Sequence, residues 1–406
     1  MAHDLDRAAG ERLSRYIEGI GTHLKDRRKR ESFAIYAAGV LGSAERKSVE
    51  PMAALASGEP ATSRHMHEKL LHFVGGSRWS DAAVRLEATQ HVCRALAQHE
   101  KVTTWVVDDT GFLKSGKHSV GVHRQYTGTA GKVTNCQIGV SLELATASQH
   151  APIDFELYLP EGWLNDAERR IKARIPEEVT FKTKIELALG MIERAVRANV
   201  PGEIILADSA YGGSNAFRQG IRALGLDYAV GIGSQAKVRR VGSNDRLGTA
   251  LTVLDLAKTI RHRRRRLLRW REGTKQTLRG RFSFCRVKTT HDDGVPIDER
   301  EPVWLVIEWP SEEDATAKFY LTTLPHRMSH KEIVRIIKER WRTERMYEDL
   351  KGELGLDHFE GRSFPGWHHH VSVVICCYAF VVAERMRAFP PSPGGQSADD
   401  TLGVAA

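Results

Sequence analysis

Two short apolar segments that each end in aspartate constrain the fold of this chain more than any other feature of its sequence. Residues 102–109 read VTTWVVDD and residues 203–208 read EIILAD. Both segments have the β-branched and aliphatic character of buried strands. A strand that is apolar on both faces and ends in a carboxylate brings a negative charge to the edge of a sheet, where a site can form. The alternative is a structural aspartate that caps the following turn or helix.

The segments around these two strands predict a sheet with helices on its faces. Strand-like runs at 119–126 and 133–143 are separated by a glycine-containing turn, which predicts three antiparallel strands in all. An amphipathic helix at 182–199 comes next, followed by the second aspartate strand, a helix at 215–224 and a strand at 227–232. This is the order of a ribonuclease H-like α/β fold, a mixed five-stranded sheet with flanking helices.

The pattern of helical, strand-like and polar segments predicts five parts of the chain. Residues 1–95 have helical periodicity and predict a helical domain, which either binds DNA or serves as a scaffold. We expect the α/β core in two pieces, 96–232 and 326–388, separated by a β-rich basic insertion at 233–325. Residues 389–406 are rich in Pro, Gly, Ser and Ala, so we expect a disordered tail.

The chain is moderately basic, with 60 Lys and Arg against 51 Asp and Glu and a net charge of +9. This balance is compatible with a polyanionic partner without establishing one. The densest basic run lies within 258–281, inside the predicted insertion. Arginines beside a tryptophan suit phosphate contact and base stacking, and a solvated surface is the alternative. The candidate DNA-contacting residues of this run are Arg263, Arg264, Arg265, Arg266, Arg269 and Trp270.

The cysteines and the apolar segments favour a reducing compartment. The five cysteines are scattered and form no CxxC pair, which argues against a disulfide framework or a structural zinc site. The first residues contain no apolar signal segment, and the most apolar stretch, 371–383, is shorter than the about 20 residues of a membrane span. We therefore expect a cytoplasmic protein with a buried helix at 371–383. For the preceding His368, His369 and His370 we expect a role in packing or in starting that helix.

A helix that begins at Ser329 carries a third candidate acid. Ser329 and Glu332 form the S-x-x-E pattern of a capping box. Glu344 and Lys351 follow Arg340 by 4 and 11 residues, and at about 100° per residue the three lie on one helix face. A glutamate between two cations suits metal binding next to substrate phosphates. The alternative is a solvated helix held by ion pairs.

Short motifs along the chain resemble those of DDE insertion-sequence transposases. The helix matches the R-(3)-E-(6)-K part of that group's Y-(2)-R-(3)-E-(6)-K signature, and DSAY at 208–211 is similar to its second-aspartate motif. DDTG at 108–111 resembles its first-aspartate motif, in the form found in the insertion-sequence-701 family. RKSVEPMA at 46–53 and GWHHH at 366–370 are also similar to that family. Ile337 departs from the signature tyrosine, and Tyr347, on the same helical face, is a candidate substitute.

The resemblance implies an enzyme that cuts and rejoins DNA strands with two divalent cations, Mg²⁺ or Mn²⁺. Asp108, Asp208 and Glu344 are then the catalytic and metal-binding residues. Asp109 is the alternative to Asp108, because adjacent strand residues point to opposite faces and only one can join the cluster. Asp108 is favoured because the group commonly has a threonine two residues after its catalytic aspartate, as Thr110 is here.

The resemblance also implies how the protein engages its substrate. Arg340, Lys351 and Tyr211 are expected to contact DNA. The partner is double-stranded DNA, both transposon ends and target, with a homodimer in the synaptic complex and a nucleoid location in a bacterial cytoplasm. Two other functions remain open: a ribonuclease H-like nuclease or resolvase that cuts without joining, and a non-catalytic DNA-binding regulator.

Overall fold

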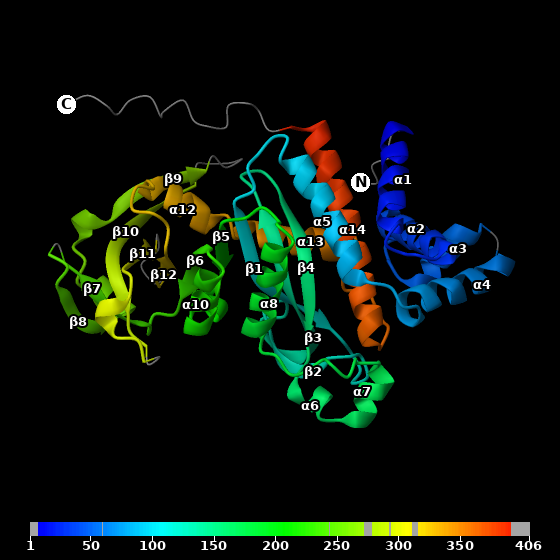
Figure 1. Cartoon of the computed structure of the whole chain (residues 1–406), viewed down its shortest axis with the longest axis horizontal. Coiled ribbons are helices and arrows are strands. Elements are labelled where there is room, and N and C mark those ends of the chain that lie inside the picture. The colour runs from blue at the N-terminus through cyan, green and yellow to red at the C-terminus, as the bar shows by residue number, and fades with distance from the viewer. Residues whose placement is uncertain are drawn as a thin grey trace.

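The computed structural model describes residues 7–58, 60–242, 244–271, 278–291, 294–310 and 316–390. These residues form an α/β structure around one large mixed sheet with helices on both faces (Figure 1). The sheet has 12 strands in the order β2-β3-β1-β5-β6-β12-β11-β10-β7-β8, with β4 also paired to β3 and β9 to β10. Residues 391–406 of the predicted tail and 272–277 of the basic run lie outside the described residues.

The first half of the sheet follows the predicted element order. Three long strands are antiparallel, and two shorter ones run parallel to the first of them. β5 reads IILA with every residue buried, as expected of a strand covered on both faces. In spatial order these five strands are β4 (His150–Tyr158), β3 (Lys132–Ala145), β1 (Thr104–Leu113), β5 (Ile204–Ala207) and β6 (Asp227–Ile232).

One antiparallel strand differs from the prediction. The strand expected at 119–126 is the shorter β2, His123–Thr127, which pairs only with the beginning of β3. The third long strand is instead β4, whose apolar pattern is interrupted by Asp154. That carboxylate is paired with Arg85 on one side and Arg194 on the other. A buried strand tolerates the charge because the charge is paired, and sequence periodicity does not reveal such pairing.

We had expected the first aspartate strand to end at its two carboxylates, but it continues beyond them. β1 continues to Leu113 because β3 is long enough to pair with it along its whole length. The parallel pairing of β1 with β5 does stop there, and its last pair is Val107 with Ala207. Asp108 and Asp208 are therefore the next residues of two adjacent strands, which in a sheet lie about 4.8 Å apart.

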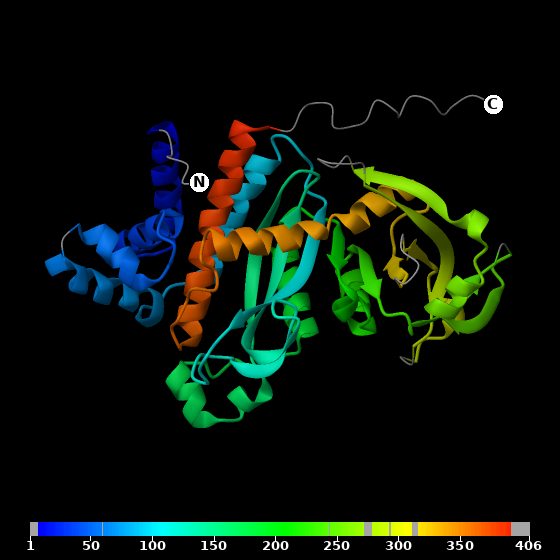
Figure 2. The same ribbon diagram turned by 180° about the vertical axis from the view of Figure 1, so that it is seen from behind.

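Helices cover both faces of this half of the sheet. α13 (Trp341–Gly352) crosses one face (Figure 2), and α8 (Lys184–Arg197) and α10 (Asn215–Ala223) lie on the other (Figure 1). α14 (Phe364–Ala388) packs beside α5 (Asp81–Leu96) along β4. The face that α13 covers therefore differs from the face that α8 covers, which decides where each aspartate of β1 can act.

One side of α14 packs against the N-terminal helices, chiefly α2 (Arg27–Leu41) and the π-helical turn at His72–Gly76. As predicted, its apolar stretch is a buried helix, and His368, His369 and His370 have packing roles. His369 Nδ1 lies 2.9 Å from the Val74 carbonyl oxygen, and His370 Nδ1 lies 2.9 Å from the Tyr36 hydroxyl. Within the described ranges, no helix has the length and apolar character needed to cross a membrane. The N-terminal helices are α1 (Arg7–Gly21), α2 (Arg27–Leu41), α3 (Val49–Ser57), α4 (Pro60–Leu71) and a π-helical turn (His72–Gly76).

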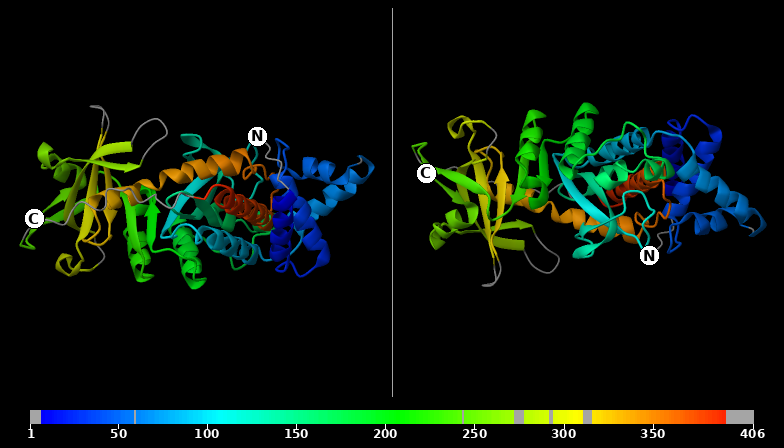
Figure 3. Two further views of the ribbon diagram at one scale, coloured as in Figure 1. Left: turned by 90° about the horizontal axis from the view of Figure 1, so that it is seen from above. Right: turned by 90° about the horizontal axis from the view of Figure 1, so that it is seen from below.

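The predicted insertion is rich in strands, and these strands extend the central sheet. β12 pairs antiparallel with β6, so the five predicted core strands belong to one continuous sheet with the insertion. Figure 3 shows the insertion at one end of the molecule and the N-terminal helices at the other. The insertion strands are β7 (Lys237–Val241), β8 (Leu247–Thr252), β9 (Arg266–Arg271), β10 (Leu278–Thr289), β11 (Val303–Trp309) and β12 (Lys318–Thr322). The insertion also contains α11 (Val253–Lys258) and 3-10 turns at His262–Arg264 and Ile297–Glu299, and two short helices follow β4: α6 (Glu161–Leu164) and α7 (Ala167–Ala173).

The helix predicted from Ser329 is present but divided. The Ser329 hydroxyl accepts a hydrogen bond from the Glu332 amide at 3.2 Å, which confirms the predicted N-cap. The first piece is α12, His330–Lys338, and tighter hydrogen bonds from the amides of 342 and 343 to the carbonyls of 339 and 340 separate it from α13. α12 packs on the insertion side, where Ile337 is only 5% exposed. The residue at the signature tyrosine position is therefore part of a core.

Candidate active site

The two adjacent aspartates of β1 point to opposite faces of the sheet. Asp108 faces α13, and its Oδ2 lies 2.8 Å from Nη1 of Arg340. Asp109 faces α8, and its Oδ2 accepts hydrogen bonds from Nζ of Lys184 at 3.0 Å and from the hydroxyl of Tyr211 at 3.1 Å. Since Glu344 is carried by α13, only Asp108 lies on the face that this glutamate can share.

Asp208 caps the short helix α9, Ser209–Gly212. Its Oδ1 accepts the amides of Ala210 at 2.9 Å and Tyr211 at 3.3 Å. The capping role considered from the sequence is thus present. It occupies one carboxylate oxygen, and Oδ2 has no hydrogen-bond partner in the part of the chain that the structure describes. Asp208 can therefore cap α9 and still offer an oxygen to a ligand.

The environment of Asp108 opposes its negative charge. Burial raises the pKa of Asp108 to about 7. The Arg340 guanidinium lowers this pKa, while the neighbouring Asp208 and Asp109 carboxylates raise it. Asp108 and Asp208 are therefore close enough to repel each other. Carboxylate oxygens are the donors that Mg²⁺ and Mn²⁺ prefer, so this pair fits a hard divalent cation.

The predicted face of α13 borders β1. Arg340 reaches Asp108, and Lys351 Nζ donates to the Gly111 carbonyl oxygen at 2.9 Å. Glu344 lies between these two contacts along the helix and is exposed. Its carboxylate forms no ion pair or hydrogen bond with any other described residue. Both predicted cations thus lie beside the strand that carries Asp108, as their spacing indicated.

The three predicted metal ligands do not form a closed metal cluster. Over the described ranges, no group of three or more His, Cys, Asp and Glu side chains is arranged to hold a metal ion. Asp108 and Asp208 are adjacent, and Glu344 is on the same side of the sheet as Asp108. Their convergence on one pair of cations consequently remains a prediction.

The site also contains Tyr347, the candidate substitute for the signature tyrosine, and Glu143, which we did not predict from the sequence. The Tyr347 hydroxyl lies 2.6 Å from the Ser141 hydroxyl, beneath α13. Glu143 is fully buried, and neither of its carboxylate oxygens has a hydrogen-bond partner in the described structure. Burial raises the pKa of Glu143 to about 8. The signal available in the sequence was one glutamate inside the long apolar run of β3.

Several predicted DNA contacts conflict with the positions of the residues. Tyr211 is 2% exposed and is bonded to Asp109, so its side chain is not available to DNA in this structure. Trp270 is half-buried and packs edge-on against Phe282, with ring centroids 5.7 Å apart. Arg265 lies 3.6 Å above the ring of Trp309. The arginines of the run that remain exposed are Arg263, Arg264, Arg266 and Arg269.

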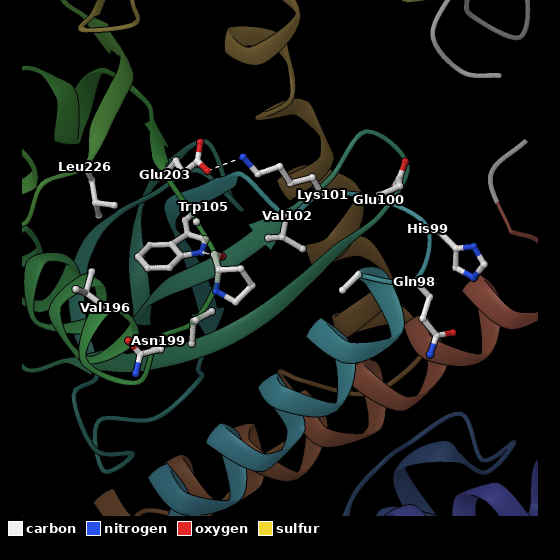
Figure 4. A pocket seen from close by; sticks show the side chains of 14 residues that line it. Gln98, His99, Glu100, Lys101, Val102, Trp105, Val196, Asn199, Glu203 and Leu226 are labelled. Atoms are coloured by element: carbon white, nitrogen blue, oxygen red, sulfur yellow. Dashed lines mark hydrogen bonds and ion pairs between the residues drawn. The ribbon is translucent and has the colours of Figure 1, made fainter. Parts of the chain in front are cut away.

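A cavity of about 780 Å³ lies away from these carboxylates (Figure 4). It is lined by residues at the beginning of β1 and β5, whereas Asp208 follows the other end of β5. Trp105 lies in its wall, and its indole N–H donates to the Pro201 carbonyl oxygen at 2.8 Å. An ion pair between Lys101 and Glu203 borders it. The cavity therefore does not belong to the carboxylate site.

Two protein families match the sequence. The family described as DDE superfamily endonuclease matches residues 20–277, and the family described as Transposase DDE domain matches residues 182–380. A curated relative, the probable transposase for insertion sequence element IS701 of Microchaete diplosiphon, is 25% identical over 223 residues. The alignment covers 55% of this chain and 54% of the relative, so the chain spans about half the relative's length. These matches confirm the resemblance drawn from the sequence motifs.

Proposed function

Because the chain belongs to the DDE superfamily endonuclease family, we propose that it is a DNA transposase that cleaves the ends of an insertion sequence and joins them to target DNA. The observation that carries the proposal is the strand register, which makes Asp108 and Asp208 the next residues of two adjacent strands, with Asp108 facing α13. The five strands β4, β3, β1, β5 and β6 and the helices that cover them then form a ribonuclease H-like catalytic core, which the basic insertion interrupts. The N-terminal helices form a DNA-binding domain.

Each residue of the proposed site has a distinct task. Asp108, Asp208 and Glu344 would hold two divalent cations, which when bound supply positive charge at the attacking and leaving oxygens of the phosphodiester. Arg340 and Lys351 hold the phosphates of the cleaved strand beside them. The protein fixes the DNA in line for attack first by water and then by the freed 3′-hydroxyl, without a covalent enzyme intermediate.

The proposed substrate is double-stranded DNA, at both the transposon ends and the target. Because two ends must be joined to one target, the synaptic complex contains two copies of the chain. The exposed arginines of the insertion lie on β9 and on the 3-10 turn before it, in the part of the sheet remote from β4. This position suits them to bind DNA beyond the cleavage site and to add sequence-independent affinity.

A strand-transfer assay separates transposition from simple cleavage. The purified chain is incubated with Mg²⁺, a target plasmid and a pre-cut end that carries a free 3′-hydroxyl. We expect the labelled end to become joined to the plasmid. Cleavage of an intact end without any joining would indicate a nuclease or resolvase, and DNA binding without metal-dependent nicking would indicate a regulator.

We expect Asp109 to support the site without binding metal. Asp109→Asn and Tyr211→Phe each loosen the contact that fixes α9 behind Asp208, so single-turnover cleavage should fall by about 10–100-fold, the effect of losing a partner that orients a metal ligand. Tyr378→Phe is the matched control, because the Tyr378 hydroxyl also donates to an aspartate, Asp349 at 3.3 Å, outside the site. An unaltered rate in both test variants would contradict this role.

A further inference from the structure

The orphaned carboxylate of Glu143 is the least expected feature of the candidate site. Its side chain has no exposed surface, and neither oxygen accepts a hydrogen bond from any described group. The Thr343 hydroxyl, on the covering helix, is close enough to lower the pKa of Glu143, although it does not reach hydrogen-bond geometry. A buried carboxyl group without a partner costs several kcal/mol. Such a group in a native fold calls for an explanation, and a partner gained in another state of the molecule is one.

Glu143 lies on the same face of the sheet as Asp108. In the antiparallel pairing of β1 with β3, Asp108 is opposite Ser141, and Glu143 is two residues further along β3. Side chains at these diagonal positions point to the same side and are about 7 Å apart. Both lie beneath α13, whose residue Arg340 is paired with Asp108. Two carboxyl groups therefore share the neighbourhood of one guanidinium.

Arg340 has the reach and the surroundings to exchange between the two carboxyl groups. Its side chain is 33% exposed and projects from the junction between α12 and α13, so its far end is not enclosed. Burial raises the pKa of Glu143, and the Thr343 hydroxyl and, more weakly, the Arg340 guanidinium act against this rise. The Arg340 charge therefore already influences both carboxyl groups. Arg340 now uses an oxygen of Asp108 that a cation at Asp108 would need.

We propose that Glu143 is a positioning residue that receives the Arg340 guanidinium when a divalent cation binds Asp108. The inference rests on the proposed function, which makes Asp108 a metal ligand. A guanidinium and a divalent cation repel each other strongly at one half-buried carboxylate, so Arg340 must leave as the cation arrives. At Glu143 the guanidinium satisfies a buried carboxylate and stays beside the site, where it can hold a phosphate with its remaining N–H groups.

The test is the Mn²⁺ affinity of the full-length, DNA-free chain, measured by titration calorimetry. Glu143→Gln removes the second carboxylate that can pair with Arg340 and should weaken Mn²⁺ binding by about tenfold. This is the loss of affinity expected when a residue that supports a metal ligand is replaced. Arg340→Ala removes the competitor and should tighten binding. In the double variant, Glu143→Gln should have no further effect, because its role requires Arg340. Glu143→Asp keeps the charge and should retain most of the affinity.

The outcomes of the titration separate this inference from the proposed function. Glu156→Gln is the matched control, because Glu156 is a glutamate of β4 that is paired with Arg194 of α8, and its loss should leave Mn²⁺ affinity unchanged. An equal effect of Glu143→Gln with and without Arg340 would show a merely structural role and overturn the inference. So would unaltered affinity in Glu143→Gln, or absence of Mn²⁺ binding in both wild type and Arg340→Ala. If Asp108→Asn leaves Mn²⁺ affinity intact, the proposed function itself fails.

Discussion

Asp108→Asn is expected to lower metal-dependent DNA cleavage by about 10³-fold or more, the scale on which an active site loses a charge-stabilising group. The substitution keeps the shape of the side chain and removes the carboxylate that faces α13 and adjoins Asp208. The measurement is single-turnover cleavage of an end-containing duplex in Mg²⁺. The effect is the largest we expect from any single substitution because the residue would bind the cations directly.

Loss of folding does not explain the expected effect of Asp108→Asn. Burial raises the pKa of Asp108 to about 7, so near neutral pH the ionised carboxylate lowers the free energy of unfolding. A neutral amide in the same place should therefore leave the thermal unfolding midpoint close to that of the wild type. Asp109→Asn is the paired control, and it should retain part of the activity. If Asp109→Asn were inactive and Asp108→Asn active, the two assignments would have to be exchanged.

The second large effect is expected in the salt dependence of DNA binding. Each lysine or arginine contact to a phosphate contributes about 0.9 to the slope of log affinity against log salt, so loss of four contacts should reduce the slope by about 3–4. The substitution combines four exposed arginines of the insertion: Arg263, Arg264, Arg266 and Arg269, each changed to Gln. Binding to a labelled duplex, measured across a range of salt concentrations, gives the slope directly.

A matched set of substitutions controls for the change in net charge. It replaces four basic residues that are 63–73% exposed outside the insertion and the N-terminal helices, so it lowers the charge of the chain equally. This set should lower the slope far less, because those residues would lie off the DNA path. Equal slopes for the two sets would argue that the insertion does not bind DNA. The control positions are Lys101, Lys172, Arg197 and Arg387.

The sequence predicted those parts of the fold that depend on local pattern. The two aspartate strands, the helix α8 between them and the N-cap at Ser329 all follow from periodicity and capping chemistry. The preference for Asp108 over Asp109 came from a motif resemblance. The structure adds a physical reason, because only Asp108 faces the helix that carries Glu344.

Features that depend on tertiary pairing were not predictable in the same way. β4 carries Asp154, whose charge is acceptable only because Arg85 and Arg194 meet it from distant parts of the chain. The division between α12 and α13 arises where two helical segments cover different cores, and each segment alone has good helical periodicity. The pairing of β12 with β6 joins strands about 90 residues apart. Glu143 could be seen in the sequence, but its isolation could not.

The most direct test of the account is a crystal structure of the chain bound to a cleaved DNA end in Mn²⁺, with anomalous scattering used to locate the cations. We expect manganese between the carboxylates of Asp108 and Asp208, with Glu344 completing the site from α13. Manganese elsewhere, or carboxyl groups of 208 and 344 too far apart to share a pair of cations about 4 Å apart, would contradict the central claim.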